Sequence, residues 1–123
     1  MRLWHESLIP HLPRQWLLGQ HRECCALRGL GWGKKHSTVD YVFEHSPARL
    51  AAYHRKVIDE MWKRGYCPNL MWEDIYYRGK NCADWNRDGS FVGYDSPIYP
   101  EHDDRYLQEC VENLRGKGIN IAT

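Results

Sequence analysis

The chain has 123 residues, a length that fits a single domain over residues 1–123 able to bury a core without disulfides or metal. It contains no run of about 18 apolar residues, and no long apolar stretch follows the first basic residue, so we expect neither a membrane span nor a secretory signal. The five cysteines are an odd number and lack any C-x-x-C spacing, which favours a reducing, cytoplasmic location over a disulfide framework.

The net charge of +1 conceals an uneven distribution along the chain. Residues 1–35 carry six basic and two acidic residues, a local balance of +4, whereas residues 69–104 carry eight acidic and three basic residues. This polarity would let one face meet a polyanion such as DNA, although scattered surface charge explains the composition equally well.

Three segments have the pattern of helices. The first begins near Pro13, which suits a first helical turn, and ends before Gly29. The second has Ser46 as its N-cap, followed by apolar residues at helical spacing up to a glycine at position 65. The third spans residues 103–116 and carries one apolar stripe.

The remaining segments read as connectors. Residues 66–102 are rich in Tyr, Trp, Asn, Gly and Pro, with at most a short helical or extended piece near Trp72–Tyr77. The sequence therefore predicts an all-α fold of three main helices with long aromatic-rich connectors.

Two features of the connectors could contact nucleic acid. The glycine-rich segment 29–35 fails the phosphate-binding P-loop pattern, but its Lys34 and Lys35 could touch a phosphate backbone if it is more than a plain connector. The loop tryptophans could stack on an unpaired base, although packing is the default interpretation for each: Trp32, Trp72 and Trp85.

A metal site can be sketched on the first predicted helix. His21, Cys24 and Cys25, with a distant histidine, have spacings that put two ligands on one helix face. No second ligand pair with matching spacing occurs elsewhere, so we expect no metal cofactor. A metal-dependent hydrolase using His21 and Cys24 stays as a minor alternative.

The adjacent pair Arg22-Glu23 lies in the most basic part of the chain. A carboxylate on a helix is usually a solvated surface group. Here, however, cationic neighbours could hold it ionised for chemistry on a polyanion.

The residues around this pair match a known pattern. The stretch from Leu12 to Glu23, LPRQWLLGQHRE, resembles the first helix of the phage-type pyrimidine-dimer DNA glycosylases, the phage endonuclease V family. Residues 63–66, KRGY, resemble that family's Lys-Arg-Gly-aromatic turn after the second helix, and residues 100–102, PEH, are a weaker match before the last helix.

The resemblance implies both a fold and an activity. The family is all-α, with the N-terminal segment threaded among three helices, and its members are glycosylases with an associated lyase activity. Their nucleophile is the α-amine of the first residue. Here that residue is Met1, which we expect to be retained because the following Arg2 is bulky.

The resemblance also implies roles for individual residues. Glu23 would stabilise the cationic sugar and move protons, Arg22 would contact phosphates, and Gln15 matches a family position directly. Arg2 matches the family's arginine after the nucleophilic residue, provided that Met1 is the nucleophile and one extra residue is absorbed before the helix. The basic N-terminal third of the chain adds further candidate DNA contacts, namely Arg28, Lys34 and Lys35. The implied partner is double-stranded DNA with a damaged base, bound by a monomer without a cofactor.

The chain departs from the family in ways that leave the lesion open. Ala26 replaces a family arginine, and the nearby Arg28 lies two residues further along the helix. Trp16 replaces a family histidine. The family's basic residues of the last helix have no counterparts in the third predicted helix. A catalytically silent nucleic-acid-binding domain on the same scaffold is therefore the alternative hypothesis.

Overall fold

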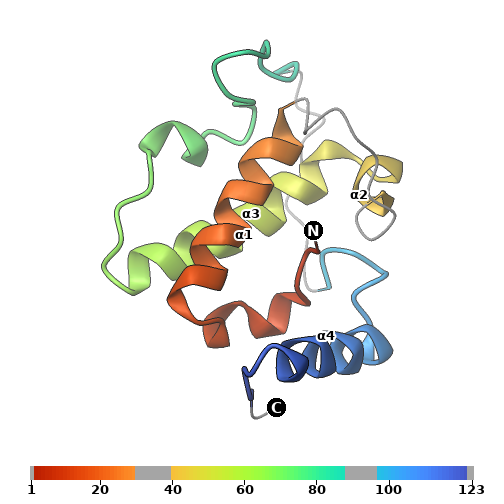
Figure 1. Cartoon of the computed structure of the whole chain (residues 1–123). Coiled ribbons are helices and arrows are strands. Elements are labelled where there is room, and N and C mark those ends of the chain that lie inside the picture. The colour runs from red at the N-terminus through yellow and green to blue at the C-terminus, as the bar shows by residue number, and fades with distance from the viewer. Residues whose placement is uncertain (1, 30–39, 88–96, 122–123) are drawn as a thin grey trace.

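The computed structural model describes residues 2–29, 40–87 and 97–121, and all regular structure within these ranges is helical (Figure 1). The three main helices are α1 (Arg14–Arg28), α3 (Pro47–Lys63) and α4 (Asp104–Gly116). The short elements are the 3₁₀ turns η1 (Glu6–His11) and η2 (Leu70–Glu73) and the single-turn helix α2 (Tyr41–Glu44). The prediction of an all-α fold with three main helices is confirmed.

The ends of the main helices follow from capping residues that the sequence shows. The Ser46 hydroxyl accepts a hydrogen bond from the Ala48 amide at 3.2 Å and caps α3. Gly65, with φ of +87°, turns the chain out of that helix in the left-handed conformation that glycine adopts without strain. The Asp103 carboxylate caps α4 by accepting from the Tyr106 amide at 2.9 Å.

The short elements lack a sequence signal of their own. A helix of four to six residues is too short to show a helical period, so the sequence does not predict the 3₁₀ turn η1 or the single-turn helix α2. The short piece expected near Trp72–Tyr77 occurs as η2, displaced towards the N-terminus because the Asn69 side chain caps it by accepting from the Met71 amide.

The N-terminal segment runs between the pair α1–α3 and α4 (Figure 1). Leu3 and Trp4 are buried, with exposed fractions of 0% and 5%. Two tyrosine hydroxyls donate hydrogen bonds to the backbone carbonyls of Leu3 and Trp4. Tyr106 of α4 donates to Leu3 O at 2.5 Å, and Tyr53 of α3 donates to Trp4 O at 2.6 Å. The segment is therefore part of the core, as the family resemblance implied.

The core lies where α1, α3 and α4 enclose this segment. Its buried apolar side chains come from every main helix and include Leu17 and Cys24 of α1, Val57 of α3 and Leu114 of α4. In the described parts of the chain, no helix combines the length and the apolar character needed to cross a bilayer.

Candidate functional site

A cavity of about 700 Å³ lies where the N-terminal segment meets α1 and the end of α4. Four of the residues singled out from the sequence line it, and they are Arg2, Gln15, Arg22 and Glu23. The other lining residues are Trp4, Trp16, Gly19, Gln20, Asn113 and Lys117. The structure thus brings together residues from both ends of the chain in one pocket.

Helix geometry explains why α1 supplies most of this pocket. Gln15, Gly19 and Glu23 are spaced four residues apart, so they lie above one another on one face of the helix. Leu17 and Cys24 lie on another face and are fully buried in the core. The face that carries Arg22-Glu23 is consequently left to line the cavity.

Gln20 connects the N-terminal segment to Glu23. Its side chain is 1% exposed, and its Nε2 donates to Glu23 Oε2 at 2.7 Å and to Arg2 O at 3.1 Å. Its Oε1 accepts from the Trp4 amide at 2.8 Å. A flipped amide would place donor against donor at Trp4 and acceptor against acceptor at Glu23, so the orientation of the amide is fixed.

Tyr53 supports this amide from α3. Its hydroxyl oxygen lies 2.8 Å from Gln20 Oε1 and 2.6 Å from Trp4 O. A hydroxyl has one proton, which the two acceptors therefore share. All the polar atoms of Gln20 thereby have partners, in a region where an unpaired polar group would be costly.

The half-buried Glu23 has an altered acidity. Burial raises its pKa because it disfavours the charged carboxylate, while the hydrogen bond from Gln20 and the nearby positive charge of Arg22 partly oppose that rise. A carboxylate with a raised pKa is a better proton acceptor near neutral pH than an ordinary surface glutamate. Its place in a pocket makes it the strongest candidate for acid–base chemistry in the described part of the chain.

Three cationic residues line the pocket, and among the described residues none of them forms an ion pair with Glu23. Arg22 and Lys117 are exposed, and Lys117 Nζ lies 5.9 Å from the centre of the Trp16 ring. Arg2 pairs with Glu109 at 3.2 Å. Exposed cations around a recessed carboxylate are suited to holding the phosphates of a nucleic acid.

Sequence reasoning missed two lining residues, Gln20 and Lys117, and the supporting residue Tyr53. Gln20 and Tyr53 are not among the predicted site residues, although both place a polar group at a helix position where the spacing predicts a core-facing side chain. Lys117 follows directly after α4, so a search within that helix for basic residues does not find it. Its approach to Trp16 depends on how α4 packs, which the sequence does not show.

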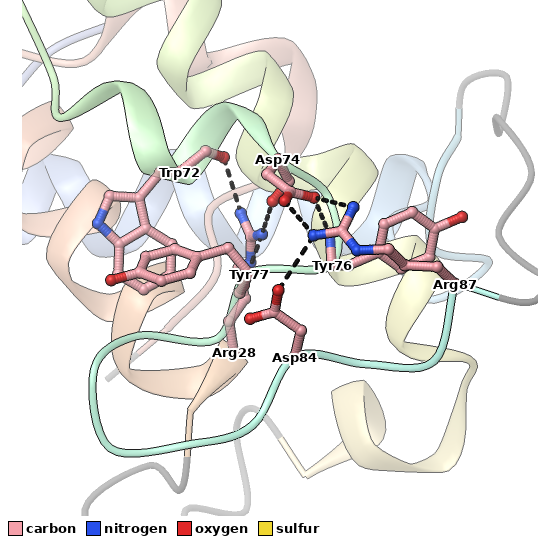
Figure 2. Close-up of polar contacts among 7 residues, drawn as sticks. All are labelled: Arg28, Trp72, Asp74, Tyr76, Tyr77, Asp84 and Arg87. Carbon is pink, nitrogen blue, oxygen red and sulfur yellow. Dashed lines mark hydrogen bonds and ion pairs between the residues drawn. The ribbon is translucent and has the colours of Figure 1, made fainter.

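Arg28 lies away from this pocket, contrary to the expectation of a DNA contact. Its side chain is 1% exposed, and its guanidinium donates to three backbone carbonyls, those of Trp72 at 3.1 Å, Asp74 at 2.6 Å and Tyr77 at 2.7 Å (Figure 2). Because these bonds engage both Nη atoms and the side chain is buried, Arg28 holds the 72–77 segment against α1 and is not available to a phosphate.

The same segment is fixed on its outer side by ion pairs. Arg87 bonds both Asp74 and Asp84, and these hydrogen bonds hold the pKa of Asp74 below its usual range (Figure 2). Trp72 and Trp85 pack beside the buried guanidinium of Arg28, at 5.0 and 5.9 Å from ring centre to Cζ. These two tryptophans have the packing role, and the base-stacking interpretation receives no support from their positions.

Part of the metal hypothesis has a structural counterpart. His21, Cys25 and the distant His54 each offer one ligand atom, all within 4.8 Å of one another. Cys24, the other cysteine proposed, is instead fully buried among apolar side chains of the core. Any metal set on α1 would therefore use Cys25.

The hydrogen bonds in this cluster work against a metal. Arginine has donors only, so His54 Nδ1 accepts from Arg28 Nη1 at 3.1 Å. Burial, and then Arg28, lowers the pKa of His54 well below its ordinary value, so the neutral ring carries its proton on Nε2, 2.8 Å from His21 Nδ1. A metal on His54 Nε2 would move that proton to Nδ1, directly against the Arg28 donor.

Four residues named from the sequence lie outside the described residues. They are Met1, Trp32, Lys34 and Lys35. Their expected roles as nucleophile, stacking group and phosphate contacts therefore stay predictions.

Comparison with protein-family models identifies the family of this chain. A family model described as pyrimidine dimer DNA glycosylase matches residues 1–74, which include the N-terminal segment, α1, α3 and η2. Comparisons with curated proteins and with solved structures gave no match. The matched region spans more than half of the chain and contains every lining residue of the cavity except the two at the end of α4. The chain belongs to the pyrimidine dimer DNA glycosylase family.

Proposed function

We propose that this protein removes a damaged base from duplex DNA and then cleaves the strand, with the α-amine of Met1 as nucleophile and Glu23 as the assisting carboxylate. The observation that carries the proposal is the bridge made by Gln20. One buried amide nitrogen donates both to the carbonyl of Arg2 and to Glu23 Oε2. The residue that precedes Arg2 in the chain is Met1, and consecutive Cα atoms are only about 3.8 Å apart.

The chemistry explains the use of an α-amine. Its ordinary pKa of about 7.7, against about 10.4 for lysine, leaves roughly 15–20% of it neutral at pH 7. The neutral amine attacks C1′ of the sugar and forms a C–N bond, while the bond from C1′ to the damaged base breaks and the base leaves with the electron pair. Loss of the amine proton and opening of the sugar ring give a Schiff base.

Glu23 would act on both halves of this reaction. As a carboxylate it stabilises the positive charge that develops on the sugar when the base leaves. As a base of raised pKa it accepts the proton whose removal from the sugar leads to strand cleavage. The exposed Arg22 and Lys117 would hold the flanking phosphates.

The substrate we propose is a duplex with a damaged base, with pyrimidine dimers as the first choice because of the family. Base extrusion costs a few kcal/mol and costs least at a distorted site, which favours a lesion over intact sequence. We further expect the protein to act as a monomer, without a cofactor, in the cytoplasm at the nucleoid.

Borohydride trapping tests the proposal directly. Protein with a native N-terminus, verified by mass spectrometry, is mixed with duplexes containing a pyrimidine dimer or an abasic site and reduced. A Schiff base would be converted to a stable amine, so we expect a covalent protein–DNA adduct that maps to the N-terminal peptide. Binding without an adduct on either duplex would favour the alternative, a catalytically silent DNA-binding domain.

Two variants locate the reacting groups. One added residue before Met1 should abolish trapping while leaving DNA binding largely intact, because it replaces the nucleophilic amine by an amide. Glu23→Gln should keep the hydrogen bond to Gln20 but lose most strand cleavage. Equal trapping by the extended protein would refute the α-amine mechanism.

A further inference from the structure

Gly19 occupies the middle of α1, where glycine is among the least favourable residues. Its backbone is helical and does not have a positive φ. A Cβ built on it would meet only the end of the flexible Arg22 side chain, at 3.7 Å, which is an ordinary contact. Neither backbone conformation nor internal packing therefore requires glycine at this position.

The pocket offers a reason for the glycine. Gly19 lines the cavity between Trp16, three residues before it, and Glu23, four residues after it, on the same face of α1. The missing side chain leaves a gap between the indole and the carboxylate, with helix backbone as its floor and the end of the flexible Arg22 side chain at its edge. A ligand in the pocket can approach α1 more closely there than at a residue with a side chain.

The walls of this gap indicate what fits it. Trp16 is partly exposed, and its ring is braced edge-on by the buried Trp4, with ring centres 6.0 Å apart and planes at 78°. At the other end are the acceptor oxygens of Glu23, and the exposed amide of Gln15 lies one turn before Gly19. An aromatic wall with nearby hydrogen-bonding groups is the environment in which proteins hold planar heterocycles.

We propose that Gly19 determines specificity by keeping open a slot for the planar ring of an extruded nucleobase, which lies against α1 between Trp16 and Glu23. The inference rests on the proposed function and adds the part of the pocket that receives the base. It assigns to the chain a preference for substrates in which a base has left the stack. Undamaged duplex, whose bases stay stacked, would not use the slot.

A series of substitutions by size tests the slot. Gly19→Ala and Gly19→Leu both introduce better helix formers, so the melting temperature should stay or rise while the slot fills. We expect affinity for a duplex with a pyrimidine dimer to fall about 10-fold for Ala and at least about 100-fold for Leu, since one methylene group in a binding pocket changes discrimination by about 10- to 200-fold. Affinity for undamaged duplex should change less than twofold.

The matched control is Gly116→Ala, which adds the same methyl group to a helical glycine outside the pocket. A Cβ there meets no atom within 4 Å. This control should bind lesion and undamaged duplexes like the unaltered protein. Trp16→Leu should reduce the lesion preference, and Trp16→Phe should restore most of it by returning an aromatic ring.

The outcomes separate this inference from the proposed function. Unchanged lesion affinity in both Gly19 variants, with folding intact, would overturn the slot even if borohydride trapping succeeds. Lesion-selective binding that falls through the series without any trapping would support the slot and refute the chemistry. An unaltered protein that binds lesion and undamaged duplex equally would overturn the slot, whatever its trapping result.

Discussion

Replacing Gln20 by methionine should uncouple Glu23 from the N-terminal segment. The substitution keeps the length of the side chain but removes the amide that bonds Arg2, Trp4 and Glu23. The buried Trp4 amide would lose its acceptor, at about 1–3 kcal/mol, and Glu23 would lose a charge-assisted hydrogen bond worth about 1.5–3 kcal/mol. We therefore expect the free energy of unfolding to fall by about 3–5 kcal/mol, measured by urea denaturation.

The acidity of Glu23 gives a second readout that a purely structural role would leave unchanged. The hydrogen bond from Gln20 lowers the pKa of Glu23 against the larger opposing effect of burial. In Gln20→Met the pKa of Glu23 should rise further, and carbon-detected NMR titration of the Glu23 carboxyl group measures this rise. Borohydride trapping on abasic duplex should slow at the same time, because the carboxylate and the N-terminal segment lose their common anchor.

Tyr53→Phe is the matched control for this experiment. It removes one buried hydroxyl that supports Gln20 and Trp4 but leaves the bond from Gln20 to Glu23 in place. It should destabilise the protein by about 1 kcal/mol without raising the pKa of Glu23. The reasoning is refuted if the two variants shift that pKa equally, or if Gln20→Met leaves it unchanged.

Three further outcomes follow from the buried groups. Because burial raises the pKa of Glu23, its ionised form destabilises the fold at neutral pH. Glu23→Gln should therefore unfold at a higher urea concentration than the unaltered protein at pH 7 but not at pH 4, and an equal urea midpoint at pH 7 would contradict this. Burial, and then His5, lowers the pKa of His102 from 6.5 to about 4, so the neutral ring contributes fully to stability above pH 6.5, and about 3 kcal/mol of that contribution is lost near pH 4 as the unfolded chain takes up the proton. His102→Gln should flatten the fall in the free energy of unfolding between pH 6.5 and pH 4, and an equal fall in both proteins would argue against this. Arg28→Met should lower the free energy of unfolding by about 3 kcal/mol and speed proteolysis within residues 72–87, without changing the DNA affinity of the folded protein. A loss of DNA affinity with normal stability would instead identify Arg28 as a phosphate contact.

Local signals in the sequence predict the helical framework and four of the ten residues that line the pocket. Capping side chains and apolar spacing determine α3 and α4, and Pro13 and Gly29 mark the ends of α1. These signals are local because they involve groups within a few residues of one another. The same local periodicity places Gln15 and Glu23 on one helix face.

Which charged residues face the pocket depends on contacts between distant parts of the chain. Arg22 and Arg28 are alike in the sequence, both arginines on the same basic helix. Packing of the 72–77 segment buries Arg28 and leaves Arg22 exposed. No local rule predicts this, because the carbonyls that bond Arg28 come from more than forty residues away.

The same holds for the partners that complete the site. Gln20 is an ordinary polar residue until the N-terminal segment and Tyr53 meet around it, and Lys117 reaches Trp16 only because α4 packs beside that segment. Long-range contacts of this kind depend on how whole helices pack. The sequence therefore identified the carboxylate, and the fold supplied the groups that position it and set its pKa.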